Sequence, residues 1–373
     1  MRLARALCFG LGICCLRMAP ACTEVLLPPA TQQWVSMRTM DYPIPLGSEM
    51  VVEPRGESWT STAPAGRRGS SWVSSYGFVG INALGLRHYT DVLNEHGLSV
   101  ATLILPETVY DSGESDHPYV EISDVATYLV SQCKNVAEVR DSLSRVRVWG
   151  ANNPLLGETP KIHLAIHDAQ GASIVVEWIN GNMNIHEDHL GVCTNAPELP
   201  AHWRNLSDYA GLSPKNAPSW LGPETNGSGM RGLPGDATST SRFVRMAVLK
   251  RYAPEITSST QAKQLAWQWM GLVWVPRGMI HSHSSSYTQW GVVRDHSQRS
   301  YAIVSDNNRT VRSLSLSDVD FSPGADRVVW DIGCGPTHVD LGQLPAKRKL
   351  SSKGVTTTVS SPATSVTCAT PAA

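Results

Sequence analysis

Cys22 is the residue of this chain whose type and position best fit covalent chemistry. It directly follows a stretch with the features of a cleavable targeting signal, in which Arg2 and Arg5 give a basic start and residues 6–16 are apolar. Ala19-Pro20-Ala21 then fits the small-x-small pattern at which such signals are cut. Cleavage there makes Cys22 the first residue of the mature chain. Its thiolate is then a nucleophile, and its own α-amine, with a pKa of about 7.7–8.0, is a base. This pairing predicts acyl transfer through a thioester.

Two charged side chains downstream of Cys22 have the chemistry to complete such a site. An N-terminal nucleophile needs a group that holds its amine, a cation that favours the thiolate, and donors for the oxyanion. Arg38 and Asp41 lie on the expected return strand of the first hairpin, which brings both back beside Cys22. The alternative interpretation of these two charges is a solvated strand end.

Five of the eight cysteines remain once the signal is removed, and an odd number in an exported protein leaves one thiol unpaired. The five are Cys22, Cys133, Cys193, Cys334 and Cys368. A disulfide and a lipid anchor are the two other interpretations of Cys22. Ala-Pro-Ala is a poor match to the sequence that precedes a lipid-modified cysteine, which disfavours the anchor.

The charge balance argues against a polyanionic partner. Residues 1–21 carry three arginines and no acid, so 31 − 3 = 28 basic and 32 acidic residues remain, a net charge of −4. Neither nucleic acid nor an anionic membrane is the expected partner of such a chain. The apolar stretch at residues 6–16 is too short to span a bilayer as a helix, and no later segment approaches the necessary length.

The elements that must position these residues are mostly strands. Strands are predicted at 23–27, 34–40, 50–52, 97–105, 162–168, 172–178, 191–195, 290–294 and 300–305. Helices are predicted within 123–147, at 241–252 and at 261–273, and Ser239, Thr240 or Ser241 is the expected cap of the second. Residues 55–71 predict a loop. Strands at both ends with helices between them favour an α+β fold.

The domain organisation follows from the same patterns. Residues 1–21 form the signal, residues 22–345 form one domain, and residues 346–373 are rich in Ser, Thr, Pro and Ala, which predicts a disordered tail.

Several motifs, in order along the chain, resemble those of the choloylglycine hydrolase family, which contains bile salt hydrolases, penicillin V acylases and acyl homoserine lactone acylases. The motifs are Cys22-Thr23, Arg38-Thr39-Met40-Asp41, Asn94-Glu95-His96-Gly97-Leu98, Ile174-Val175-Val176-Glu177, Gly191-Val192-Cys193-Thr194-Asn195-Ala196-Pro197, Asn205-Leu206-Ser207-Asp208-Tyr209, Gly232-Leu233-Pro234-Gly235-Asp236 and Ser241-Arg242-Phe243-Val244-Arg245. The signal resembles that of the exported, Gram-negative branch of the family. The order of the motifs, together with the position of Cys22 at a cleavage site, makes the resemblance specific.

The resemblance implies an N-terminal nucleophile hydrolase fold, the αββα sandwich in which two stacked antiparallel sheets lie between helical layers. It also implies a role for each matching residue. Cys22 would attack the substrate carbonyl carbon, Asp41 would hold the α-amine of Cys22, and Arg38 would lie by the sulfur. Asn195 would donate its side-chain amide to the oxyanion, and Arg242 would complete the polar cluster.

One position departs from the family pattern. The family has Asn or Tyr where this chain has Ile104, and it uses mainly the backbone N–H there as the second oxyanion donor. Ile104 is therefore predicted to serve through its backbone, while a polar group that could recognise substrate is lost. The segment between Asn195 and Arg242 is shorter than in bile salt hydrolases, where it builds an arm used in tetramer assembly. A homo-oligomer therefore stays an open alternative.

Other histidine-containing stretches predict no metal site. The segment from His186 to His189 is not an H-E-x-x-H motif, because its two histidines are three residues apart. His163 and His167 share one strand face and are predicted to line a half-exposed sheet. No Gly-rich phosphate loop and no G-x-S-x-G motif occurs in the sequence. We therefore expect neither a metal nor a cofactor.

We expect a secreted or periplasmic, cofactor-free hydrolase of linear amides that acts on small N-acyl compounds. Acyl homoserine lactones and penicillin V rank above conjugated bile salts as substrates, by resemblance to the exported branch. The alternatives are a catalytically silent secreted binding protein on the same fold, a lipid-anchored protein, and an acyltransferase that uses an amine acceptor.

Overall fold

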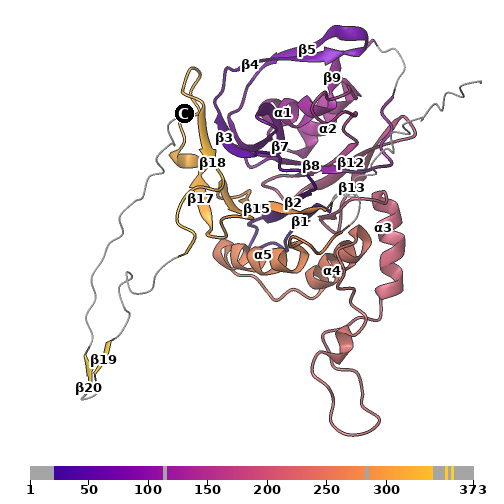
Figure 1. Cartoon of the computed structure of the whole chain (residues 1–373), viewed down its shortest axis with the longest axis vertical. Coiled ribbons are helices and arrows are strands. Elements are labelled where there is room, and N and C mark those ends of the chain that lie inside the picture. Colours follow the sequence, from indigo (N-terminus) through magenta and orange to yellow (C-terminus); the bar gives the residue numbers. More distant parts are fainter. Residues whose placement is uncertain (1–20, 112–115, 282–284, 339–348, 352–353, 357–373) are drawn as a thin grey trace, which may run out of the picture.

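The computed structural model describes residues 21–111, 116–281, 285–338, 349–351 and 354–356. Two antiparallel sheets lie face to face, and helices cover the outer face of each (Figure 1). One apolar core fills the space between the two sheets and extends under the helices that cover the six-stranded sheet. A second core lies under the helices that cover the eight-stranded sheet. The α+β sandwich predicted from the sequence is confirmed.

The six-stranded sheet carries Cys22. Its strands, in spatial order, are β14 (Val192–Cys193), β1 (Thr23–Leu26), β2 (Val35–Tyr42), β15 (Tyr287–Asp295), β16 (Ser300–Ser305) and β17 (Arg312–Ser315). All residues of β1 and β2 are buried, because these strands lie at the centre of the sheet with another layer on each side. The predicted hairpin is confirmed, and its register pairs Thr23 with Thr39. This register places Cys22 at the level of the last residues of β2.

The eight-stranded sheet lies against it. Its strands, in spatial order, are β13 (Asn182–Glu187), β12 (Ser173–Ile179), β11 (Ile162–His167), β8 (Ser99–Ile104), β7 (Leu86–Asn94), β6 (Phe78–Ala83), β3 (Glu49–Glu53) and β18 (Val328–Asp331). Alternation along β11 sends Leu164 and Ile166 to the helix side and Ala165 to the space between the sheets.

The prediction of a half-exposed face for His163 and His167 is wrong. These residues share the inner face with Ala165, and they are only 2% and 1% exposed. Each faces a buried carboxylate, His163 that of Glu177 and His167 that of Glu24. The strand therefore has a polar face that is buried, a pattern that period-2 alternation alone cannot distinguish from exposure.

The helices form the outer layers. On the eight-stranded sheet lie α1 (Ile122–Gln132) and α2 (Val136–Ser144), and on the six-stranded sheet lie α4 (Ser239–Arg251) and α5 (Ser259–Val273) (Figure 1). The short helix α3 (Leu199–Leu206) packs beside α4. The expected cap of the second predicted helix is corrected by one residue, since the side chain of Thr238 accepts a hydrogen bond from the backbone N–H of Ser241. No helix in the described part of the chain is long and apolar enough to cross a membrane.

Residues 55–71 do not form the predicted loop. They belong to a two-stranded ribbon of β4 (Ser58–Ala63) and β5 (Arg67–Val73), in which Trp59 and Trp72 stack across the strands with ring centroids 6.3 Å apart. The ribbon is rich in Gly, Ser and Arg because most of its residues face solvent, and this composition hides its strands. A parallel pair joins β9 (Tyr119–Glu121) to β10 (Arg147–Trp149).

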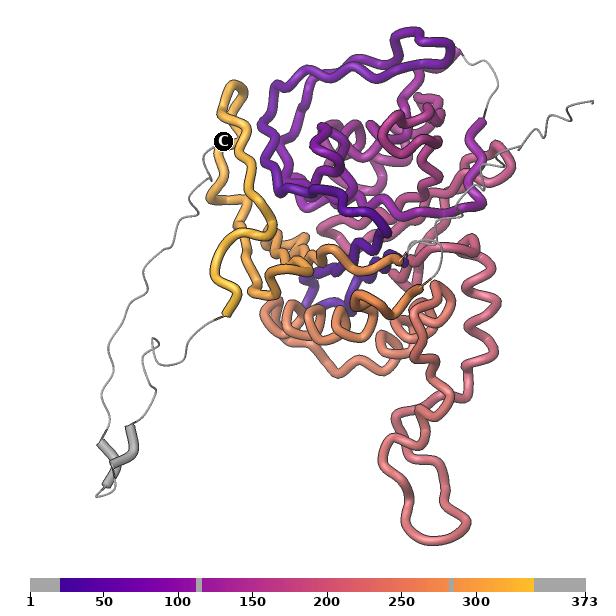
Figure 2. The backbone as a smooth tube through the Cα atoms, viewed as in Figure 1, coloured from indigo at the N-terminus to yellow at the C-terminus, as the bar shows by residue number. Residues whose placement is uncertain are grey.

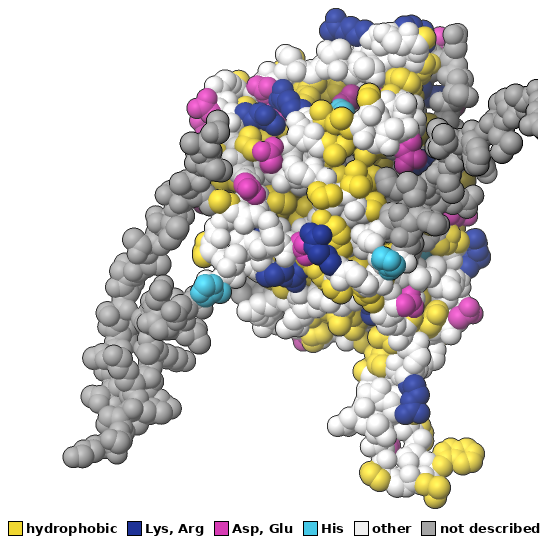
Figure 3. Space-filling view, in the orientation of Figure 1, with side chains coloured by type: hydrophobic (Ala, Val, Ile, Leu, Met, Phe, Trp, Pro, Cys, Tyr) yellow, Lys and Arg dark blue, Asp and Glu magenta, His cyan; other side chains and the backbone are white. Residues whose placement is uncertain are grey.

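Two segments extend away from the sandwich. Residues 207–238, between α3 and α4, form a long projection that ends in apolar atoms (Figure 2, Figure 3). Trp220 and Leu221 on this projection are 98% and 93% exposed. The predicted tail of residues 346–373 lies largely outside the described residues, and its described parts are two short paired strands, β19 (Lys349–Ser351) and β20 (Gly354–Thr356).

Candidate active site

The thiol of Cys22 is enclosed at the start of β1. Cys22 is 1% exposed, and its Sγ lies 3.8 Å from Met40 Sδ and 3.8 Å from the carbonyl oxygen of Asp41. Burial raises the pKa of this thiol, and the positive charge of Arg38 opposes that rise. The preceding residue, Ala21, is also buried. In the uncleaved chain the thiol is therefore held in its neutral form.

Asp41 presents a buried carboxylate that lacks a good hydrogen-bond donor. It is fully buried, and neither oxygen makes a hydrogen bond of good geometry among the described residues, although the hydroxyls of Thr39 and Thr288 lie nearby. Burial raises the pKa of Asp41 to about 7, against the opposing charge of Arg242. Such a carboxylate is suited to bind a cation.

The side-chain amide of Asn195 bridges two other members of the site. Its Oδ1 accepts a hydrogen bond of 3.0 Å from Arg242, and its Nδ2 donates one of 2.8 Å to the carbonyl oxygen of Ile104. Arg242 also donates to the carbonyl oxygen of Cys22 and to the hydroxyl of Thr23. Burial lowers the pKa of Arg242 to about 10, so it stays charged near neutral pH. Arg242 therefore connects Cys22 with Asn195.

His202 supports the backbone of Asn195. Its Nε2 lies 2.9 Å from the carbonyl oxygen of Asn195 and 3.2 Å from the hydroxyl of Thr194. Burial lowers the pKa of His202 to about 4, so the ring is neutral at physiological pH. A neutral ring that carries its proton on Nε2 donates to the Asn195 carbonyl and fixes this residue next to Cys22.

Arg38 lies in the interior of the sandwich. It is fully buried between the sheets, where it donates to the carbonyl oxygens of Thr90 and Thr102 and lies 3.2 Å from Asp91. Its guanidinium also lies over the ring of Trp290, 5.3 Å from the ring centroid. The alternative interpretation, a solvated strand end, is excluded by this burial.

Cys22 lines an apolar pocket between the two sheets. Its described lining contains no Lys, Arg, Asp or Glu, and its hydrophobic part is Met40, Tyr42, Leu46, Ala83, Leu84, Leu86, Tyr89, Leu103, Ile104, Ile122, Leu156, Pro160 and Ile162. Polar groups are few, among them His88, Ser123 and Asn153. The pocket is suited to an uncharged, hydrophobic group whose reacting atom lies at Cys22.

The described residues contain no group of three or more His, Cys, Asp or Glu side chains placed to hold a metal ion. The His186 to His189 stretch lies at the end of β13, where His186 Nε2 is 3.3 Å from the carboxylate of Glu177.

Comparison with known proteins decides the family. The model of the linear amide C–N hydrolases of the choloylglycine hydrolase family matches residues 22–329, and the match begins at Cys22. The chain belongs to the choloylglycine hydrolase family. Relatives include a bile salt hydrolase/transferase of Bifidobacterium longum, which is 28% identical over 76% of this chain and 91% of its own length. A penicillin V acylase of Pectobacterium atrosepticum is 23% identical over 87% of this chain and 88% of its own.

Solved structures of choloylglycine hydrolases show the same fold. A crystal structure of a variant of the conjugated bile acid hydrolase from Clostridium perfringens has a TM-score of 0.74 at 20% identity, and it covers 87% of this chain and 100% of its own. Penicillin V acylase from Agrobacterium tumefaciens has a TM-score of 0.71 at 24% identity over 83% of this chain and 91% of its own. The fold described above is therefore shared with solved members of this family.

The structure brings together the site residues that the sequence predicted for a choloylglycine hydrolase. Cys22, Asn195, Arg242 and Ile104 form a chain of direct contacts. Asp41 contacts the Cys22 sulfur through its backbone, and its charge acts on the thiol, as does that of Arg38. The assignment of the Ile104 backbone N–H as an oxyanion donor stays a prediction.

Sequence reasoning missed the buried partners of Arg38. Asp91 forms a salt bridge with the guanidinium of Arg38, and Arg294 and Tyr301 bind the carboxylate of Asp91. Glu24 in turn pairs with Arg294. Two signals were present in the sequence, because Asp91 directly precedes Val92-Leu93 and Arg294 directly follows Val292-Val293, and an unpaired charge beside buried apolar residues is costly.

Proposed function

We propose that the mature chain, beginning at Cys22, hydrolyses the amide bond of a small N-acyl compound through an acyl-Cys22 thioester. The observation that carries this proposal is the position of Cys22, which begins the family match, lines the apolar pocket and lies beside the carboxylate of Asp41. Removal of residues 1–21 frees an α-amine at Cys22, and Asp41 is the buried carboxylate available to hold this amine and to stabilise the ammonium ion that it becomes when it accepts the thiol proton.

The proposed reaction has two halves. The α-amine accepts the thiol proton, and the thiolate attacks the acyl carbonyl carbon. The oxyanion that forms accepts hydrogen bonds from Asn195 Nδ2 and from the backbone N–H of Ile104. The C–N bond then breaks, and the α-ammonium returns its proton to the departing amine. Water, deprotonated by the same α-amine, attacks the thioester carbon, which releases the carboxylic acid and restores the thiol.

The amide orientation of Asn195 supports its part in this reaction. Arg242 can only donate hydrogen bonds, so the amide must turn its oxygen toward Arg242 and its NH₂ group toward Ile104. One N–H of this group is used by the Ile104 carbonyl, and the other is available for the oxyanion. Arg242 thus determines that the NH₂ group of Asn195, and not its oxygen, is available to the substrate.

The lining of the pocket supports a hydrophobic acyl group. Since no charged residue lines its described part, an anionic acyl group would lose its hydration without gaining a partner. Acyl homoserine lactones, penicillin V and conjugated bile salts all have uncharged acyl groups, so all three are compatible with this lining. The lactones and penicillin V are our first candidates by resemblance to the exported branch. Bile salts and penicillin V are the substrates named for the relatives of this chain.

We also propose that the chain is exported and acts outside the cytoplasm, after the signal at residues 1–21 has been removed. The proposal rests on the basic start, the short apolar stretch and Ala19-Pro20-Ala21 before Cys22. Export and maturation would then be one event, because the cut that removes the signal also creates the α-amine.

The test is amine release by processed protein and by its Cys22→Ser variant. The panel contains penicillin V, short-chain and long-chain acyl homoserine lactones, and glycocholate. We expect release from one class, with loss of at least about 10²-fold in the variant, because an alcohol is a poorer nucleophile than a thiolate here. Cys22→Ser that retains turnover would overturn the assignment of the nucleophile.

Intact-mass analysis of the same preparation is the control. A mass that begins at an unmodified Cys22 supports the enzyme, whereas a diacylglyceryl adduct supports the lipid-anchored alternative. If the N-terminus is free, the panel gives no amine, and a substrate still binds, the secreted binding protein is the correct function. Addition of an amine acceptor, with analysis of the products, separates hydrolysis from acyl transfer.

A further inference from the structure

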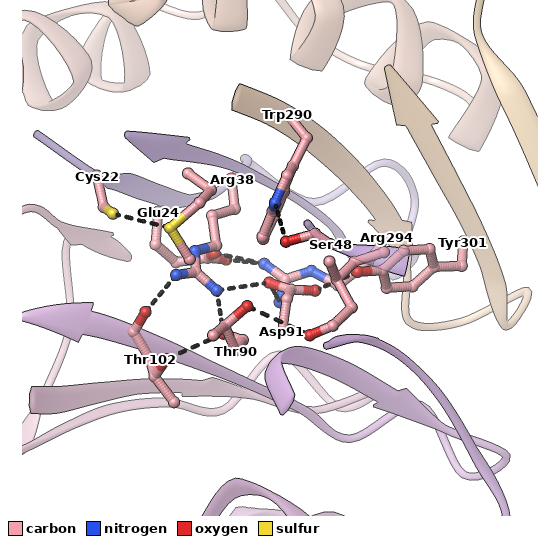
Figure 4. Close-up of polar contacts among 12 residues, drawn as sticks. Cys22, Glu24, Arg38, Ser48, Thr90, Asp91, Thr102, Trp290, Arg294 and Tyr301 are labelled. Atoms are coloured by element: carbon pink, nitrogen blue, oxygen red, sulfur yellow. Dashed lines mark hydrogen bonds and ion pairs between the residues drawn. The ribbon is translucent and has the colours of Figure 1, made fainter. Parts of the chain in front are cut away.

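Four buried charges form one network between the two sheets. Glu24, Arg38 and Arg294 come from the six-stranded sheet and Asp91 from the eight-stranded sheet, and all four are fully buried (Figure 4). Arg294 pairs with both oxygens of Glu24. Two carboxylates and two guanidinium groups thus balance in charge.

Asp91 is the member of this network that joins Arg38 to the rest. Its Oδ2 lies 3.2 Å from Arg38 Nη1 and 3.0 Å from Arg294 Nη1, and its Oδ1 accepts a hydrogen bond of 2.6 Å from the hydroxyl of Tyr301. Among the residues that the structure describes, Asp91 is the one carboxylate that forms a salt bridge with Arg38. The orientation of this carboxylate is fixed from three directions.

The other hydrogen bonds of Arg38 also lead to the eight-stranded sheet. Its guanidinium donates to the carbonyl oxygens of Thr90 in β7 and Thr102 in β8. Thr90 and Thr102 line the pocket that contains Cys22. The positive charge of Arg38, which acts on the Cys22 sulfur, is therefore held in place by backbone carbonyl groups of the opposite sheet that belong to residues lining the pocket.

We propose that Asp91 is a positioning residue for the reaction: through its salt bridge it holds the guanidinium of Arg38 at the place where it favours the Cys22 thiolate. Arg294 and Tyr301 hold Asp91 in turn. This inference rests on the proposed function, since it requires Cys22 to be the nucleophile. It adds a residue that touches neither the substrate nor the sulfur.

Like-charge repulsion explains why Arg38 depends on this carboxylate. Arg38 and Arg294 share one oxygen of Asp91, so their guanidinium groups lie close together in a medium of low dielectric constant. Without the negative charge the two cations repel each other, because an amide oxygen that accepts from both supplies no opposing charge. The NH₂ group of such an amide would also face the hydroxyl of Tyr301, which now donates to Asp91 Oδ1. Arg38 then has no anionic partner and moves from the sulfur.

A double-mutant cycle tests the coupling between Asp91 and Arg38. Asp91→Asn in processed protein is expected to lower kcat by about 10²-fold, the loss typical of a misplaced catalytic group, with KM nearly unchanged. In an Arg38→Met background the same substitution is expected to cause no further loss, because its effect is exerted through Arg38. A full loss in that background would overturn the proposal.

Asp295→Asn is the matched control. Asp295 is also fully buried and also ion-paired, 3.4 Å from Lys263, but it lies at the far end of β15 from Cys22. It is expected to lower the melting temperature without changing kcat, alone or with Arg38→Met. If the loss of kcat in Asp91→Asn is matched by Asp295→Asn at equal loss of stability, Asp91 has only a structural role.

Tyr301→Phe keeps the test valid if Asp91→Asn does not fold. It leaves the charge of Asp91 in place and removes one hydrogen bond to it, so we expect a smaller loss of kcat, about three- to tenfold. This loss should also vanish in the Arg38→Met background. A Tyr301→Phe effect that persists there would contradict the chain of contacts from Tyr301 through Asp91 to Arg38.

Alkylation of the Cys22 thiol separates failure of this inference from failure of the proposed function. The rate of reaction with iodoacetamide at pH 7, followed by mass spectrometry of the peptide that contains Cys22, requires no substrate. We expect Asp91→Asn to slow this reaction about tenfold and Asp295→Asn to leave it unchanged. An unchanged rate in Asp91→Asn overturns the positioning role, whereas turnover that survives Cys22→Ser overturns the function instead.

Discussion

The side-chain amide of Asn195 is oriented by a group that can only donate hydrogen bonds. Arg242 donates a hydrogen bond to its oxygen, and the NH₂ group is left to donate to the Ile104 carbonyl and to the substrate. Asn195→Ala is therefore expected to lower kcat by about 10²–10³-fold, or about 2.7–4 kcal/mol, the effect of losing one oxyanion donor. Steady-state kinetics of amine release measure this loss.

Asn195→Asp is the informative companion. It preserves the shape of the side chain but gives Arg242 a charged partner and removes the N–H donor. Activity as low as in the alanine variant would indicate that the donor is what matters. A loss below about tenfold in Asn195→Ala would remove Asn195 from the oxyanion site.

Asp41 gives the uncleaved chain a pH-dependent stability. Burial raises its pKa from 3.8 to about 7 in the folded chain, so the folded state binds the proton more tightly than the unfolded state does. The stability that this group contributes is present below pH 4 and is lost as the pH rises from about 4 to about 7. Asp41→Asn should remove this loss, and thermal unfolding of uncleaved protein at pH 5 and pH 8 measures it.

The mature chain should respond in the opposite way to Asp41→Asn. There the α-ammonium of Cys22 is the expected partner of the carboxylate, so the substitution removes a favourable pair and most of the turnover. Equal effects of Asp41→Asn on the stability of cleaved and uncleaved protein would argue that Asp41 does not meet the α-amine.

At the level of elements, the turn between β7 and β8 aligns two strands that serve the site. Gly97 in this turn has a φ of +85°, and a Cβ there would lie 2.1 Å from the carbonyl oxygen of His296. Gly97→Ala is expected to destabilise the protein by about 2–4 kcal/mol, since backbone strain and a clash with rigid backbone both contribute. Chemical denaturation measures the change.

Gly85, in the turn between β6 and β7, is the matched control. Its φ is +66°, but a Cβ there meets no atom within 4 Å. Gly85→Ala should thus cost only the strain of the left-handed backbone, about 1–2 kcal/mol. If the two substitutions cost the same, the contact between Gly97 and His296 is not significant.

The sequence predicted those elements whose period or motif is strong. The β1–β2, β11–β12 and β15–β16 hairpins, β8 and the helices α1, α2, α4 and α5 were found, with errors of up to three residues at their ends, whereas α3 was not predicted. The β4–β5 ribbon was missed, because its strands are mostly polar and exposed, apart from Trp59 and Trp72, and have the composition of a loop.

The site was predictable where it depends on motifs and unpredictable where it depends on the contact between sheets. Cys22, Asn195 and Arg242 lie in recognisable segments, and they meet as expected. Asp91 and Arg294 are distant in sequence, and only the packing of one sheet on the other brings them together. No local pattern contains that information.

For the whole molecule, we expect activity and tertiary structure to be lost together. The contacts of Arg38 cross from one sheet to the other, so the catalytic arrangement requires both sheets in their native positions. In a urea titration, amine release and tryptophan fluorescence should show the same midpoint. Activity that disappears at clearly lower urea, while the fluorescence is still native, would show that the site opens on its own.

The side chain of Arg38 links the two sheets mechanically. Its main chain is fixed in the six-stranded sheet and its guanidinium is bound by the eight-stranded sheet, and Arg294 and Tyr301 cross to Asp91 in the same way. Sliding of one sheet past the other therefore strains these side chains. Two sheets linked in this way near their centres resist sliding past each other more than they resist bending of their outer edges. The projection at residues 207–238 and the edge strand β18 therefore have freedom to vary in length and sequence, whereas the spacing of the two sheets does not.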